Sequence, residues 1–148
     1  MAEHDLCDQT DMPNTHPSDL RERVFDFVCS VVLFCRELST EPGVVRQIAW
    51  QLADAVTSVG SNLEEAKAAY SRRDFAAKNA ISLKEMRETL YWLRVILQCN
   101  LAAASVVQPL LAEASELTAM LTAGMKRLHP ILLLLTIVGL SSMLWLAF

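Results

Sequence analysis

The sequence predicts an all-α protein, an antiparallel up-down-up-down four-helix bundle with an additional C-terminal apolar helix. Three observations predict this fold class. Apolar residues recur at spacings of three and four in four long segments, no run alternates with a period of two, and the 148 residues include only 4 Gly and 5 Pro. Short connections between long helices place consecutive helices antiparallel to each other. The length suits a single domain.

Each of the first two predicted helices carries one apolar stripe. The first spans residues 18 to about 38, Pro42 then interrupts the pattern, and the second spans about 44 to 69. Gly60 lies inside the second helix, where Gly costs roughly 1 kcal/mol relative to Ala, so it predicts close helix–helix approach or a local adjustment. The residues predicted to face the core are Val24, Phe27 or Val28, Val31, Phe34 or Cys35, Leu38, Val45, Ile48, Leu52, Ala55 or Val56, Val59 and Leu63.

The third and fourth predicted helices begin at capping signals. Ser71 with Asp74 resembles a capping box, with Asp in the usual place of Glu or Gln, and opens a helix that runs to about Cys99. Ser105 and Gln108 match the S-x-x-Q box and open the fourth helix. The residues predicted to face the core are Phe75, Ser82, Met86, Leu90 or Thr89, Leu93, Ile96 or Leu97, Leu110, Leu111, Ala114, Leu117, Leu121 and Gly124.

Charge divides the chain into three parts. Residues 1–17 hold four acidic residues and no Lys or Arg, which predicts a disordered acidic tail because such a segment buries too little apolar surface to become ordered. Residues 18–128 carry 13 acidic and 13 basic residues and form the predicted bundle. Residues 129–148 contain no Lys, Arg, Asp or Glu and form an apolar C-terminal segment, a candidate transmembrane anchor. The formal net charge of −4 therefore lies wholly in the acidic tail.

The uncharged residues 128–148 predict contact with a membrane. These 21 residues would form a helix about 32 Å long, similar to the ~30 Å hydrocarbon core of a bilayer. Lys126 and Arg127 precede them, on the side that the positive-inside rule keeps in the cytosol. Two alternatives are an extension of the fourth helix that is buried by oligomerisation, and an aberrant tail created by a change of reading frame.

The location expected from the sequence is the cytoplasm, with tethering to the cytoplasmic membrane by the C-terminal segment. Residues 1–17 lack the basic and apolar regions of a secretory signal. Cys7, Cys29, Cys35 and Cys99 form no C-x-x-C pair, so buried, reduced thiols are expected in place of disulfides or a metal site.

The positions of the histidines argue against an enzyme. A di-iron bundle needs Glu-x-x-His ligands on its helices, but His4, His16 and His129 all lie outside the predicted bundle. The glutamates at positions 64, 65, 85 and 88 would at most form an all-carboxylate site, and we expect them to be solvated. The sequence has no G-x-S-x-G motif and no Gly-rich phosphate loop. We therefore expect no catalytic residue, no bound metal and no cofactor.

A basic cluster is the candidate binding site. Residues 67–94 hold seven Lys and Arg against three Asp and Glu, a local charge of +4, and such clusters bind phosphate backbones without reading the base sequence. Aromatic residues for base stacking are scarce, because Tyr91 and Trp92 are expected to pack in the bundle or between subunits. The alternative is that the bases only pair with neighbouring acids and solvate the surface. The candidate nucleic-acid-binding residues are Lys67, Arg72, Arg73, Lys78, Lys84, Arg87 and Arg94.

Four motifs carry a resemblance to a known family. They are S-V-G-S-N-L-E-E-A at 58–66, S-R-R-D-F at 71–75, L-K-E-M-R-E-T at 83–89 and Y-W-L-R at 91–94. Over residues 18–125 the chain resembles the small bacterial four-helix-bundle proteins first noted in intervening sequences of 23S rRNA genes. The same family includes the accessory variability protein of diversity-generating retroelements.

The resemblance implies an oligomeric binding scaffold. Family members look like long antiparallel bundles that assemble into rings, often pentamers, and the retroelement member is a nucleic-acid-binding partner of a reverse transcriptase. We therefore expect a non-enzymatic homo-oligomer that binds DNA, RNA or a nucleoprotein such as a reverse transcriptase. The alternative is a membrane-tethered protein–protein interaction module with no nucleic-acid role. Family chains generally end soon after the fourth helix, so residues 129–148 depart from the family pattern.

Overall fold

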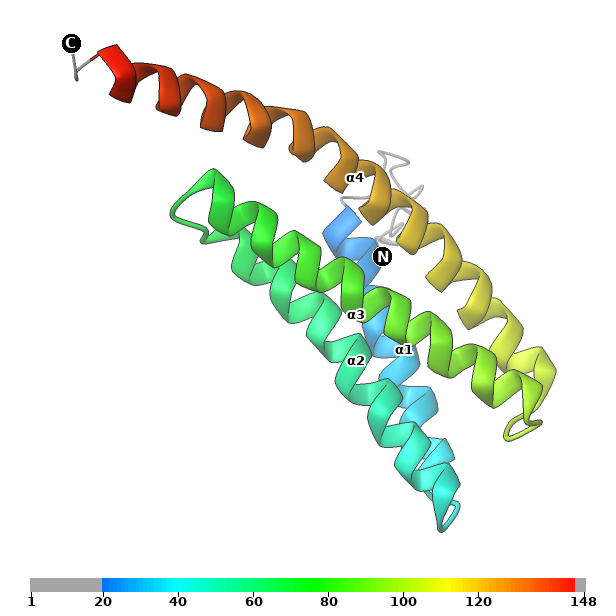
Figure 1. Ribbon diagram of the computed structural model, residues 1–148. Coiled ribbons are helices and arrows are strands. Elements are labelled where there is room, and N and C mark those ends of the chain that lie inside the picture. Colours follow the sequence, from blue (N-terminus) through cyan, green and yellow to red (C-terminus); the bar gives the residue numbers. More distant parts are fainter. Residues whose placement is uncertain (1–19, 146–148) are drawn as a thin grey trace, which may run out of the picture.

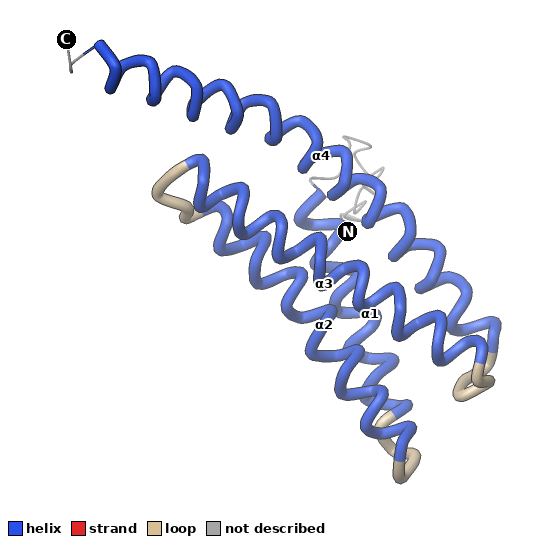
Figure 2. The backbone as a smooth tube through the Cα atoms, in the orientation of Figure 1, coloured by secondary structure: helices blue, strands red, loops and turns tan. Residues whose placement is uncertain are grey.

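A computed structural model describes residues 20–145, with side chains over residues 20–128. Its helices are α1 (Leu20–Leu38), α2 (Val44–Lys67), α3 (Arg72–Gln98) and α4 (Ala104–Trp145), and successive helices run in opposite directions (Figure 1). Short loops join them, and residues 20–145 contain no strand (Figure 2). The predicted all-α four-helix fold is confirmed. The predicted acidic tail, residues 1–17, lies outside the described residues.

The four helices pack in cyclic order. Helix α1 lies next to α2, α2 next to α3, α3 next to α4 and α4 next to α1, whereas the backbones of the diagonal pairs stay farther apart within the described residues. The α1/α2 side of the bundle therefore lies opposite the α3/α4 side. The first two helices therefore form one long outer surface of the molecule, and the last two helices form the other.

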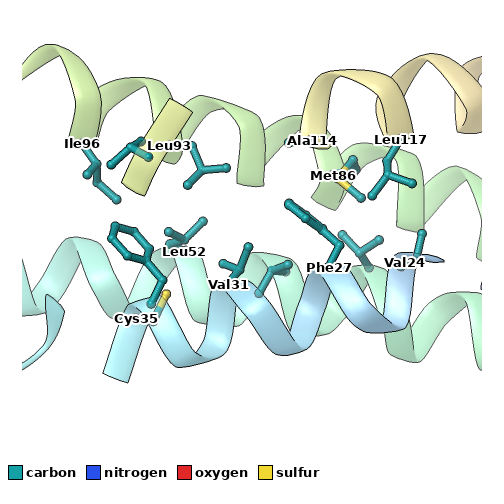
Figure 3. Close-up of a cluster of buried hydrophobic side chains, with 14 of the residues drawn as sticks. Val24, Phe27, Val31, Cys35, Leu52, Met86, Leu93, Ile96, Ala114 and Leu117 are labelled. Atoms are coloured by element: carbon teal, nitrogen blue, oxygen red, sulfur yellow. The ribbon is translucent and has the colours of Figure 1, made fainter. Parts of the chain in front are cut away.

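The core is apolar along its length and draws on all four helices. Val31 of α1, Leu52 of α2, Met86 of α3 and Leu117 of α4 all point into the interior (Figure 3), and each of the four is fully buried. Every predicted core position is buried or half-buried except Gly124, which is exposed. Gly60 lies against α1 as the sequence suggested, because a methyl group added there would come 3.4 Å from Val28 Cγ2. The 3-4 spacing was therefore sufficient to locate the core, since each helix presents one apolar side to its neighbours.

Local capping geometry fixes both ends of α3. The Ser71 hydroxyl accepts a hydrogen bond from the Asp74 amide at 3.0 Å, as the capping box predicted. After α3, Asn100 adopts a left-handed φ of 53°, and the amides of Asn100 and Leu101 donate to the carbonyls of Leu97 and Ile96. These two bonds form a Schellman motif, which stops the helix. The cap predicted at Ser105 is wrong, because α4 begins one residue earlier, at Ala104.

The apolar C-terminal segment continues α4 and is not a separate helix. Helix α4 has 42 residues, which corresponds to about 63 Å at 1.5 Å per residue. Figure 1 shows its last turns projecting beyond the loop that joins α2 to α3. The predicted membrane anchor depends on the side chains of residues 129–148, and these lie outside the side chains that the structure describes. Among the residues searched, no helix combines the length and the apolarity that crossing a membrane requires.

Two glycine substitutions should change stability in opposite directions. Gly43 has a φ of 79°, so Gly43→Ala should lower the free energy of unfolding by about 1–3 kcal/mol through backbone strain. Gly124 lies in α4 with nothing within 4 Å of an added methyl group, so Gly124→Ala should raise it by about 0.5–1 kcal/mol. Urea unfolding monitored by circular dichroism measures both. Equal effects of the two substitutions would contradict the backbone assignment at Gly43.

The cysteines should differ in reactivity. Burial raises the pKa of the Cys35 thiol from 9.0 to about 12. The expected burial is wrong for Cys29 and Cys99, which are exposed. In a Cys7→Ser background, a thiol reagent at neutral pH should label Cys29 and Cys99 quickly and Cys35 only after unfolding. Because the unfolded thiol ionises near pH 9 and the folded one near 12, Cys35 should cost stability progressively between these values. Cys35→Val should remove that part of the alkaline loss, and three equal labelling rates would refute the burial of Cys35.

Candidate nucleic-acid interface

One exposed side of α3 carries a line of basic residues. Residues 73, 84, 87, 91 and 94 fall within a sector of about 80° on a helix that turns about 100° per residue, and all five are exposed. The line from the first to the last of them is about 32 Å long at 1.5 Å per residue. We call Arg73, Lys84, Arg87, Tyr91 and Arg94 the basic stripe.

The carboxylates of α3 lie beside the basic stripe, toward α2. Trp92 donates a hydrogen bond from Nε1 to Glu88 at 3.3 Å, and Trp92 lines a hollow with Ile48 and Gln51 of α2. Glu85 is mostly buried, with 16% of its side chain exposed, and lies 3.5 Å from the Lys84 ammonium. Along its exposed sector α3 therefore presents positive charge without an interleaved carboxylate.

The seven predicted residues separate into paired lysines and unpaired arginines. Lys67 lies 2.9 Å from Glu64, Lys78 pairs with Glu65 on α2, and Lys84 pairs with Glu85. The hydrogen bond to Glu65 raises the pKa of Lys78. In contrast, within the described part of the chain no carboxylate lies within 4 Å of the arginines Arg72, Arg73, Arg87 and Arg94.

The structure brings only some of the predicted residues together. Arg73, Lys84, Arg87 and Arg94 share the basic stripe, and Arg72 lies at its end in the first turn of α3. Lys67 and Lys78 belong to the α2/α3 side, where their glutamate partners hold them. The sequence cluster therefore contained two sets of bases with different surroundings.

Two carboxylates of α4 bind an arginine of α1 and so lie away from the basic stripe. Arg23 donates from Nε to Glu113 Oε1 at 2.6 Å and from Nη2 to Glu113 Oε2 at 2.8 Å. It also donates from Nη2 to Glu116 Oε2 at 2.5 Å. These charged hydrogen bonds raise the pKa of the guanidinium above its ordinary value. Both glutamates are thus held on the α1 side of α4.

The side of α4 that faces α3 is neutral or basic. Leu111 lines a shallow hollow with Tyr91 and Arg94, and the residues at i+4, i+7, i+11 and i+15 from it share that side. They are Ser115, Thr118, Thr122 and Lys126. Lys126 is exposed and extends the basic surface onto α4. Lys126 lies outside the continuous segment 67–94 that held the predicted bases, but its helical spacing from Leu111 places it on the same side.

A family model for the 23S rRNA-intervening sequence protein matches residues 18–123. The chain belongs to this family. The resemblance predicted from the motifs is therefore confirmed, and the last 25 residues lie beyond the family match.

A solved structure agrees with the family assignment. It is the crystal structure of a protein with unknown function from the S23 ribosomal protein family of Bacteroides thetaiotaomicron, which superposes with a TM-score of 0.67 at 27% sequence identity. The match covers 73% of this chain and 99% of that one. No curated protein matches the chain.

Tyr91 does not pack inside the bundle, and the other expected position, between subunits, stays a prediction. It is 55% exposed, and its ring meets that of Trp92 edge to face, with centroids 5.1 Å apart. Trp92, in contrast, is half-buried. This family member therefore places one aromatic ring between Arg87 and Arg94 on the basic stripe, where a nucleotide base could stack on it.

The glutamates considered for an all-carboxylate site are engaged elsewhere. Glu64 and Glu65 pair with Lys67 and Lys78, and Glu85 and Glu88 contact Lys84 and Trp92. Over the described residues no group of three His, Cys, Asp or Glu side chains is placed to hold a metal ion. That no cofactor binds stays a prediction.

The Arg23 contacts should stabilise the bundle measurably. In a double-mutant cycle of Arg23→Met and Glu113→Gln, we expect a coupling energy of about 1 kcal/mol, because the pair is bidentate and partly shielded from water. The exposed pair of Lys67 and Glu64 is the matched control and should show about 0.2–0.5 kcal/mol. Urea unfolding gives both values. A coupling for Arg23 no larger than the control would show that the contact is not structural.

Proposed function

We propose that this chain is a non-enzymatic, homo-oligomeric scaffold that binds the backbone of DNA or RNA, free or within a nucleoprotein. The basic stripe is the binding surface, and the base sequence is not read. The observation that carries the proposal is the exposed sector of α3 with four bases and no carboxylate, flanked by the neutral or basic side of α4.

Arginine chemistry supports phosphate as the ligand. A guanidinium donates two parallel hydrogen bonds to phosphate oxygens. Arg73, Arg87 and Arg94 have no ion pair within the described residues, so binding phosphate breaks no existing contact. Each phosphate contact releases condensed counterions, so the affinity depends steeply on salt concentration. The bases repeat in every copy of an oligomer, which multiplies their effect.

Tyr91 favours single-stranded nucleic acid. Its exposed ring lies one turn from both Arg87 and Arg94, a combination that allows a base to stack while the adjacent phosphates are bound. Stacking on an aromatic side chain contributes about 1–3 kcal/mol per base in other proteins and tolerates any base. Tyr91→Ala should therefore weaken binding to single strands more than binding to duplexes.

The decisive measurement is the salt dependence of binding. For four phosphate contacts, the logarithm of the association constant for duplex DNA should fall with the logarithm of salt concentration with a slope of about −3 to −4. The double variant Arg87→Gln/Arg94→Gln should reduce that slope by about 2. Fluorescence anisotropy with labelled single- and double-stranded oligonucleotides measures it.

The matched control is Arg36→Gln, which removes an exposed arginine from α1 and should leave the slope unchanged. Binding of the full chain without a salt slope, or no binding at low salt, would exclude the proposal. A loss caused equally by Arg36→Gln would show that only net charge matters, and the basic stripe would then have no specific role.

The alternative function is a membrane-tethered protein–protein interaction module. It is favoured by the absence of charge in residues 128–148 and by the continuation of α4 as a helix to Trp145. In that function the bases of α3 serve only solubility, so Arg87→Gln/Arg94→Gln would have no effect on any binding. Fractionation of cells that express the full chain separates the two functions, because only a tethered protein sediments with the membranes.

A further inference from the structure

The α1/α2 side, opposite the basic stripe, exposes apolar side chains. Phe25 is 62% exposed, Val32 38% and Trp50 63%. Val28 and Ala53 lie between them and are half-buried. We call Phe25, Val28, Val32, Trp50 and Ala53 the apolar face.

A hollow lies at the end of this surface that holds Phe25. It measures about 240 Å³ and is lined by Phe25 and Val28 of α1 and by Thr57, Gly60 and Ser61 of α2. The short side chains of α2 keep the floor of the hollow low, so that a helix can approach closely. Phe25 forms one wall of the hollow.

Charges bound the apolar face at its two ends, and Asp54 of α2 is exposed at its outer edge, one turn from Trp50. Arg21 and Glu64 line one end of the hollow. At the other end Arg36 is exposed in the last turn of α1, and Arg46 donates to the Ser39 carbonyl at 2.9 Å. Between Phe25 and Arg36, α1 rises about 16 Å. The surface therefore suits a helix with an uncharged middle.

This chain itself contains such a helix. Fourteen of residues 129–148 are apolar and none is charged. The helical part, residues 129–145 of α4, is about 25 Å long and is called here the α4 extension. Leu128 lines one hollow with Leu20, the first residue of α1. The α4 extension therefore begins level with the start of α1 and runs away from it (Figure 1).

The α4 extension cannot reach the apolar face of its own bundle. Helix α4 contacts α1 and α3 but not α2 in the described residues, and the α4 extension continues the same unbroken helix. Only a second copy can bring its α1/α2 side to this helix.

We propose that the α4 extension of one copy docks on the apolar face of a second copy. The two surfaces match in their apolar side chains and in length, about 25 Å of helix over a surface of about 16 Å. The contact is heterologous, so each copy donates one α4 extension and receives another, and repetition closes a ring or a reciprocal pair. It rests on the self-association in the proposed function but not on nucleic-acid binding, because the basic stripe lies on the opposite side.

Three full-length variants test the docking. Phe25→Glu/Trp50→Glu charges the apolar face, Leu134→Glu/Val138→Glu charges the α4 extension, and Leu33→Glu is the matched control. Leu33 is 52% exposed but lies outside the apolar face. Light scattering after gel filtration in detergent-free buffer should give at least twice the 16.5 kDa chain mass for the native chain and for Leu33→Glu. Each double variant should fall to 16.5 kDa.

Mixing the two double variants is the decisive step. Phe25→Glu/Trp50→Glu, the face variant, keeps an intact α4 extension. Leu134→Glu/Val138→Glu, the extension variant, keeps an intact apolar face. The mixture should therefore form a one-to-one pair of twice the chain mass. Circular dichroism should show unchanged helix content in every variant, since the substituted residues Phe25 and Trp50 are exposed.

Several results would overturn the proposal. A native chain that is monomeric, or a face variant that stays oligomeric, would show that the apolar face is not an interface. A mixture that stays at 16.5 kDa would show that the two surfaces are not partners. The α4 extension would instead be a membrane-binding segment if the native chain and the face variant both sediment with lipid vesicles and the extension variant does not. An unchanged salt slope of nucleic-acid binding in the face variant keeps this test separate from that of the proposed function.

Discussion

The contact of Arg23 with Glu113 and Glu116 joins the first helix of the bundle to the last. The apolar core holds the four helices together, and this contact holds two carboxylates of α4 beside α1. Because both glutamates lie on the α1 side, the α3/α4 surface keeps only hydroxyl groups and Lys126 beside the basic stripe. One arginine thus contributes to bundle closure and to the charge asymmetry on which the proposed binding surface depends.

That asymmetry reconciles a neutral bundle with a basic surface. Residues 18–128 carry 13 acidic and 13 basic residues, so no net charge attracts a polyanion from a distance. The glutamates, however, lie away from the basic stripe. They pair with Lys67 and Lys78 near α2 and with Arg23 near α1. At ionic strengths where electrostatic interactions are screened beyond about 8–10 Å, a phosphate near Arg87 or Arg94 responds to its local surroundings and not to the sum over the chain.

Local signals in the sequence predicted the fold, whereas long-range pairing decided the site. The apolar stripe from Val24 to Leu38 and the cap at Ser71 depend on residues within a few positions of each other, so their spacing was enough. Lys78 and Glu65 are 13 positions apart, and Arg23 and Glu113 are 90. Nothing in a linear pattern shows which turns of two helices face each other. The predicted cluster at 67–94 therefore contained bases that pair with glutamates as well as bases that do not, and it did not include Lys126.

Stability and surface chemistry are separated along this chain. The last buried core side chain of the described residues of α4 is Leu121, and the family match ends at residue 123. Phe25 and Trp50 are more than half exposed and contribute little to that core. Large apolar side chains that add little to folding, on a bundle whose last helix continues without charge, indicate a surface that needs a partner. Because these residues can be changed without removing core contacts, a loss of assembly in such variants would report on the interface and not on unfolding.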